Sequence, residues 1–168
     1  DLNFRRDDDV IRGTRIVTDI PPPPHVRKRG YYGNVDQTKI MTFHPPSTVP
    51  IEVTTTETGR PPGQPKGALD FHIIIYSSMT PETPGSCHYF WALARDFDTG
   101  NRDFTEFFHR EVVRAFDEDK DMLEAQQRII DLDPAAPTVD VRADAGGLQA
   151  RRIVERLIAD ESRAPPDA

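Results

Sequence analysis

The fold is decided by residues 102–130, RDFTEFFHREVVRAFDEDKDMLEAQQRII. Apolar side chains recur there at steps of three and four residues, which is the period of an amphipathic helix. They are Phe104, Phe107, Phe108, Val112, Phe116, Leu123 and Ile130. At about 1.5 Å per residue this helix would be roughly 40 Å long, so we expect it to span a domain.

One acidic residue falls within the apolar stripe of this helix. At about 100° per residue, Asp119 lies within roughly 20° of the centre of the stripe. The other acids of the segment 116–127 lie about 120–180° away, on the solvent side. These acids are Asp117, Glu118, Asp121 and Glu124. An acid inside an apolar stripe is costly to bury unless a cation, a hydrogen-bond network or a metal compensates it.

The residues alone leave three explanations for Asp119. It could mark a local irregularity of the helix, or it could pair with an arginine such as Arg95 or Arg128. It could also bind a metal, since one carboxylate and two imidazoles form the facial triad of non-haem Fe(II) oxygenases. None of the five histidines lies one helical turn from another, so no local histidine motif supports the metal.

The segments before the long helix have the character of strands. β-Branched, aromatic and alternating apolar patterns predict strands over residues 10–18, 38–44, 51–56, 69–76 and 86–97. Pro21–Pro24 is expected to be an extended connector, and Thr80–Gly85 a turn that closes a hairpin. The strand at 86–97 is apolar on both sides, so we expect both faces of the sheet to be covered.

After the long helix we expect a short extended piece at 139–141 and a last helix over 148–161. Asp144 is placed to cap that helix. With 168 residues, 36% of them hydrophobic, the chain should form one soluble domain over residues 1–163, with a flexible tail over 164–168. It opens at Asp1 without a methionine, which suggests a fragment or a trimmed domain.

Composition also argues against several classes of function. No stretch approaches the roughly 20 apolar residues of a membrane span. A net charge of −7 disfavours nucleic acid as a partner, because such proteins concentrate Lys and Arg. The single cysteine, Cys87, cannot form an internal disulfide, which fits a cytoplasmic protein.

Five motifs, together with the final helix, resemble the Rieske non-haem iron oxygenases. The resemblance is strongest to vanillate O-demethylase oxygenase subunits and dicamba monooxygenase-like proteins, and it runs from about residue 69 to 162. The motifs are Thr80-Pro81-Glu82-Thr83, Ser86-Cys87-His88-Tyr89-Phe90-Trp91, Arg95-Asp96-Phe97, Glu118-Asp119-Lys120 and Glu124-Ala125-Gln126-Gln127.

The resemblance implies that Asp119 is the carboxylate ligand of a mononuclear Fe(II). In that family the two histidine ligands and the Rieske [2Fe-2S] cluster are supplied upstream, by motifs that this sequence lacks. The chain therefore resembles the C-terminal part of the catalytic domain, and we expect it to be inactive alone. Ser77 and Arg110 fall at positions of substrate contact, where some members have His and Trp. Gln126 lies near the inward stripe and could support the site through a hydrogen bond.

For the complete enzyme, the resemblance implies O-demethylation or hydroxylation of an aromatic acid. O₂ and electrons from a reductase or ferredoxin would be consumed, and the assembly would be a homotrimer. The implied fold is α+β, the helix-grip fold of the START and Bet v 1 type. In it an antiparallel sheet wraps a long helix, with a pocket between them and a further helix at the C-terminus.

Two other functions remain open because the helix-grip fold does not determine a reaction. The first alternative is a non-enzymatic domain that binds a small apolar or aromatic ligand without iron. The second is an assembly subunit that contributes only shape to a larger complex. Asp119 distinguishes the first from the oxygenase, since a carrier gains nothing from an unpaired acid facing its cavity.

Overall fold

The structure is a computed structural model that describes residues 2–60, 67, 70–137 and 139–163. The chain forms two compact units, one of Asp1–Phe97 with Val141–Ala168 and the other of Asp98–Asp140. A single domain over residues 1–163 stays a prediction. The expected flexible tail, 164–168, lies outside the described residues.

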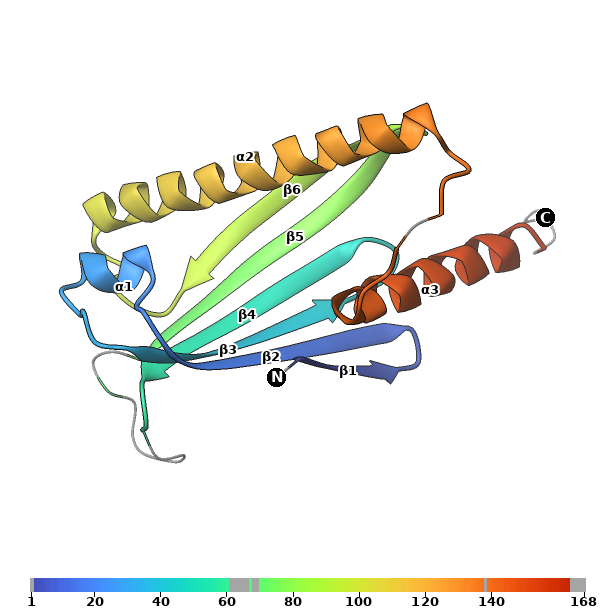
Figure 1. Ribbon diagram of the computed structural model, residues 1–168. Coiled ribbons are helices and arrows are strands. Elements are labelled where there is room, and N and C mark those ends of the chain that lie inside the picture. Colours follow the sequence, from blue (N-terminus) through green and yellow to red (C-terminus); the bar gives the residue numbers. More distant parts are fainter. Residues whose placement is uncertain (1, 61–66, 68–69, 138, 164–168) are drawn as a thin grey trace, which may run out of the picture. The chain divides into compact units, whose positions relative to one another are not determined.

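The first unit contains a six-stranded antiparallel sheet in the order β1-β2-β3-β4-β5-β6 (Figure 1). Its strands are β1 Leu2–Asp7, β2 Val10–Ile20, β3 Val35–Phe43, β4 Thr48–Glu57, β5 Phe71–Thr83 and β6 Ser86–Arg95. Each strand pairs with the next one along the chain, in the antiparallel orientation. The expected strands are confirmed, most of them longer than the sequence pattern indicates, and β1 is an addition.

The two faces of the sheet differ in burial. Alternate residues form an inner face, on which Ile11, Val35, Val53, Phe71 and Ile73 are buried. The expectation that both faces are covered is wrong for the described chain. Tyr76 and Phe90 lie on the opposite, outer face, and they are 47% and 59% exposed. The fold is therefore α+β with an antiparallel sheet, as expected, and its core lies on the inner side.

The turn between β5 and β6 is shorter than the sequence suggests. Residues 80–85 were expected to form it, but β5 continues to Thr83 and only Pro84 and Gly85 separate the strands. Pro81 is tolerated because β4 pairs with β5 only as far as Ser78. Beyond that point β5 has a single neighbour, so the missing N–H of proline leaves no partner unsatisfied.

A short helix, α1 (Pro24–Lys28), follows the run of prolines that was expected to be wholly extended. Proline is favoured at the first helical position because its φ angle is already helical and its missing N–H has no helical partner there. Val26 is fully buried and anchors α1. In the expected extended piece at 139–141, Val141 has extended backbone, and the 3₁₀ helix η1 (Arg142–Asp144) follows it directly.

The long helix of the second unit is α2 (Arg102–Leu132), within two residues of the expected 102–130. Asn101 caps it, since its side-chain oxygen accepts a hydrogen bond from the Phe104 N–H at 3.0 Å. Phe104 and Phe108 are buried, with ring centroids 5.9 Å apart. The apolar side chains after Lys120 are exposed in the described chain, namely Met122, Leu123, Ile129, Ile130 and Leu132.

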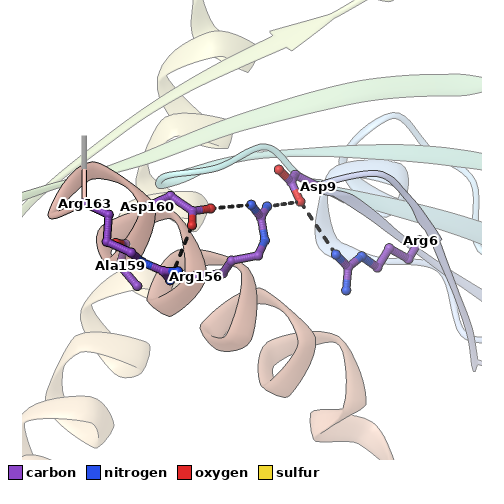
Figure 2. A network of polar contacts seen from close by, with 6 residues as sticks. All are labelled: Arg6, Asp9, Arg156, Ala159, Asp160 and Arg163. Atoms are coloured by element: carbon purple, nitrogen blue, oxygen red, sulfur yellow. Dashed lines mark hydrogen bonds and ion pairs between the residues drawn. The ribbon is translucent and has the colours of Figure 1, made fainter. Parts of the chain in front are cut away.

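The last helix, α3 (Ala145–Glu161), belongs to the first unit and begins three residues before its expected start at 148. Asp144 precedes it, but the carboxylate accepts from the Val141 N–H at 2.8 Å instead of capping α3. Figure 2 shows how Arg156 joins α3 to Asp9 at the turn between β1 and β2. Within the described residues, no helix combines the length and apolar character that crossing a membrane requires.

Candidate functional site

Asp119 lies on α2 at the azimuth that the sequence predicts. Because α2 is continuous, Phe108, Val112 and Ile130 lie within about 20° of Asp119 around the helix axis. Its side chain is nonetheless exposed, and among the described residues it has neither a hydrogen bond nor an ion pair. Its apolar neighbour Leu123, one turn further along α2, is 64% exposed as well.

The described residues do not by themselves form an iron centre. Across 2–60, 67, 70–137 and 139–163, no three His, Cys, Asp or Glu side chains are placed to share an ion. Asp119 can provide one carboxylate, which is a suitable ligand for Fe(II) but a weak one alone. Any complete ligand set therefore requires residues beyond these.

Gln126 and Arg110 lie on α2 with Asp119, but in different directions. Gln126 follows Asp119 by seven residues, so it lies on the same face, about 10 Å along the axis. Arg110 precedes Asp119 by nine residues, which places it about 180° away on a regular helix. Both side chains are exposed. The structure therefore groups Gln126 with Asp119 and separates Arg110 from it.

Ser77 lies on β5 and points to the inner face, where it is only 4% exposed. Its hydroxyl is 2.8 Å from the Tyr89 hydroxyl on β6. The two residues are diagonal neighbours, because Tyr89 is paired with Met79. Ser77 is predicted from sequence without this partner, although the alternation of β6 indicates that Tyr89 shares a face with Trp91.

A second polar pair on the inner face was not found from sequence. Gln37 on β3 donates from its side-chain amide to the Thr55 hydroxyl on β4, at 3.2 Å. Both residues are buried, and they are cross-strand partners. The only signal is their alternation with buried apolar residues. The inner face thus carries buried hydroxyl and amide groups as well as an apolar surface, a combination typical of small-molecule sites.

Solved structures define the class of fold. The chain is similar to the crystal structure of dicamba monooxygenase bound to 3,6-dichlorosalicylic acid, with a TM-score of 0.84 and 22% sequence identity. The similarity covers 98% of this chain and 48% of that one. A structure of dicamba monooxygenase with non-haem iron and dicamba also matches, with a TM-score of 0.72.

The family follows from the sequence comparison. Residues 1–160 match the model of the vanillate O-demethylase oxygenase C-terminal domain, and the chain belongs to this family. It is 35% identical over 155 residues to a vanillate O-demethylase oxygenase subunit of a Pseudomonas species, covering 92% of this chain and 43% of that protein. It is 36% identical over 135 residues to a putative toluene-4-sulfonate monooxygenase system iron-sulfur subunit of Comamonas testosteroni. That match covers 79% of this chain and 38% of that protein. The chain thus spans less than half the length of these relatives.

Proposed function

We propose that the chain is the C-terminal part of the catalytic domain of a Rieske-type aromatic oxygenase. The complete protein would O-demethylate or hydroxylate an aromatic acid, using O₂ and electrons from a reductase or ferredoxin. Membership of the family over residues 1–160 carries this proposal. The names of the relatives support it, since they include a demethylase and a sulfonate monooxygenase system.

In this proposal Asp119 is the carboxylate ligand of a mononuclear Fe(II), and Gln126 supports the same face of α2. The Asp119 carboxylate is available, because it is exposed and has no partner among the described residues. Its two imidazole partners would come from beyond these residues, as would the Rieske [2Fe-2S] cluster. When bound, the iron would supply the activation of O₂. The described residues do not by themselves complete that centre.

Ser77 and Arg110 are the proposed substrate contacts. Ser77 is the better supported of the two, because its buried side chain forms a hydroxyl pair with the half-exposed Tyr89 on the inner face. Such a pair can donate one hydrogen bond outward and accept another. An arginine at position 110 suits a substrate carboxylate. Arg110 and Asp119 can serve one site only if α2 departs from a regular helix between them.

The assembly is also part of the proposal. The complete protein would be a homotrimer in the cytoplasm, receiving electrons from a separate reductase or ferredoxin. Neither nucleic acid nor a membrane is expected as a partner. One relative is named as the iron-sulfur subunit of a monooxygenase system, which supports an arrangement of separate components.

The experiment is an iron measurement on the full-length protein with Asp119→Asn. We expect the mononuclear Fe(II) to be lost at least tenfold more readily, because an amide is a poorer ligand than a carboxylate. Electron paramagnetic resonance of the nitric oxide adduct reports this iron separately from the Rieske cluster. Asp121→Asn is the matched control, since Asp121 lies on the opposite side of the same helix turn.

If Asp119→Asn retains the mononuclear iron in full, Asp119 is not the carboxylate ligand of the oxygenase. Binding of an aromatic compound by a full-length protein that takes up no iron would instead favour the alternative, a carrier with a helix-grip fold. Loss of iron in both variants would indicate general damage to α2 and would also contradict a specific role for Asp119.

A further inference from the structure

The inner face of the sheet carries two cations that lie directly opposite each other. Arg15 on β2 and Lys39 on β3 are cross-strand partners, so their side chains leave the sheet on the same side. That side is the inner face, because Lys39 is also paired with the buried Val53 on β4. Like charges in this position repel, so the pair destabilises the folded chain unless an anion compensates it.

No acid among the described residues provides that compensation. Neither Arg15 nor Lys39 forms an ion pair there. Arg12, which points to the outer face from the same strand as Arg15, does approach an acid, Glu52, at 3.9 Å. Burial, together with the charge of Arg15, lowers the pKa of Lys39 below its ordinary value, as expected for an amine without a carboxylate.

A third basic group is within electrostatic range of this pair. Burial first, and then the charge of Lys39, lower the pKa of His25 on α1. The buried amide of Gln37 lies two residues before Lys39 on the same face. The surroundings of Lys39 are therefore short of negative charge and contain hydrogen-bond donors, while Val53 and Met41 beside it are apolar.

We propose that Arg15 and Lys39 form an anion-binding site for the carboxylate or sulfonate group of a small organic molecule. Arginine presents a planar fork that matches such a group with two hydrogen bonds, and lysine adds a compact charge. An organic anion fits better than an inorganic one, because the apolar neighbours suit an apolar body. Two cations in a chain of net charge −7 do not suit a polyanion.

This site is separate from the substrate contact proposed at Ser77. Ser77 lies two strands away from Lys39 across the sheet and four residues further along, as the registers show. With strands about 4.8 Å apart and about 3.4 Å per residue, the two positions are roughly 17 Å apart. The inference therefore goes beyond the proposed oxygenase activity and requires neither iron nor turnover.

The test is calorimetric titration of the full-length protein with benzoate and with benzenesulfonate. Benzamide is the neutral probe of the same shape, and inorganic phosphate tests for a general response to anions. We expect both organic anions to bind and benzamide to bind at least tenfold more weakly. Lys39→Met and Arg15→Met should each weaken the binding of both anions at least tenfold, which is the magnitude of a hydrogen bond to a charged group. Lys39→Arg keeps the charge, so it should retain affinity within about threefold.

Two control variants make the result specific. Arg12→Met removes a cation from the outer face of the same strand, and it should leave affinity unchanged within about twofold. Ser77→Ala should also leave this site intact, which separates it from a substrate that is itself an aromatic acid. Because Arg15 is exposed, Arg15→Met is expected to fold even if Lys39→Met does not.

A second readout follows the repulsion itself. Without ligand, Lys39→Met should melt no lower than the parent protein, because the substitution removes a charge that has no partner. In the parent protein, benzoate should raise the pKa of His25 followed by nuclear magnetic resonance, and this rise should vanish in Lys39→Met. The proposal would be overturned if neither organic anion binds, or if benzamide binds as tightly as they do. It would also be overturned if phosphate binds more tightly than the organic anions, or if Arg12→Met weakens their binding as much as Lys39→Met does.

Discussion

Burial determines the protonation state of His25. Its ring lies edge-on to Phe71, with centroids 6.4 Å apart. Burial first, and then the charge of Lys39, lower the pKa of His25 to about 4 from 6.5. Between these values the unfolded chain binds a proton that the folded chain excludes. The contribution of neutral His25 to stability is therefore complete above pH 6.5 and is lost as the pH falls towards 4.

We therefore expect His25→Gln to flatten the dependence of stability on pH. Between pH 7 and pH 5 the parent chain should lose about 2 kcal/mol more unfolding free energy than the variant, as the shift in pKa requires. Urea unfolding at the two pH values measures this difference. His44→Gln, which removes an exposed imidazole, should behave like the parent chain. An equal pH dependence in parent and His25→Gln would contradict the assignment.

At the residue scale, the sequence predicts the side of an element on which a side chain lies better than it predicts which residues surround that side chain. A helical wheel places Asp119 in line with Phe108 because the geometry of a helix is local. Whether Asp119 is covered depends on what lies opposite it, and no feature of the helix sequence encodes that. The pairs Ser77–Tyr89, Gln37–Thr55 and Arg15–Lys39 were missed for a related reason, since they depend on the register between strands.

Among the elements, the packing of α3 involves two glycines that both approach the same edge of one aromatic ring. A Cβ atom added at Gly146 would lie 2.5 Å from the Phe4 ring, and one added at Gly13 would lie 2.8 Å from it. Phe4 and Gly13 are cross-strand partners on β1 and β2. The ring therefore occupies the space that both missing side chains leave.

We predict opposite effects for two neighbouring substitutions in α3. Gly146→Ala should destabilise the chain by about 1–3 kcal/mol, because it overpacks the Phe4 contact. Gly147→Ala meets no atom within 4 Å, so it should stabilise the helix by about 0.5–1 kcal/mol through helix propensity. Thermal and urea unfolding measure both. Two effects of the same sign would contradict the proposed contact.

The C-terminal half of α3 is held by charged side chains. Arg156 bonds to Asp9 and to Asp160, while Arg6 approaches Asp9 from the other side at 3.6 Å (Figure 2). These groups are largely exposed, so each ion pair contributes little to global stability and is screened by salt. Their role is to fix the end of the helix against the turn between β1 and β2.

Arg156→Met should therefore loosen α3 locally and leave the sheet unchanged. We expect faster amide hydrogen exchange in the last two turns of α3, with unchanged protection in β3 and β4. Raising the salt concentration should shift the parent chain towards the behaviour of the variant. Arg152→Met removes an exposed arginine of the same helix and should have no such effect. Unchanged exchange in Arg156→Met would refute the role of this contact.

At the element scale, periodicity was the reliable guide. The repeat of apolar residues over α2 gave its start and its end to within two residues, because a long pattern averages over local exceptions. Proline was the misleading signal. Pro24 begins α1 and Pro81 lies inside β5, and in both places the missing N–H has no partner to lose. Only the neighbours in the fold distinguish these positions from a loop.

For the chain as a whole, charge and apolar exposure are concentrated in the unit Asp98–Asp140. It contains 12 acidic and five basic residues, which accounts for the entire net charge of −7. The same unit exposes the apolar side chains of α2 after Lys120. Repulsion between copies and attraction between apolar faces therefore oppose each other on one helix, and salt weakens only the repulsion.

We accordingly expect this chain to stay monomeric at about 0.05 M salt and to associate at about 0.5 M, where charges are screened over a few ångströms. Sedimentation velocity measures the distribution at both concentrations. The double substitution Leu123→Gln with Ile130→Gln should abolish the association without lowering the melting temperature, because neither side chain is buried in the described chain.

The control for this experiment is Ile158→Gln on α3, which removes a similarly exposed apolar side chain from the other unit. It should leave the salt-dependent association intact. If the double variant on α2 melts lower than the parent chain, Leu123 and Ile130 contribute to packing within a single copy. Association that is equally strong at low salt would show that the charge of this unit does not oppose contact, contrary to the argument from its 12 acids.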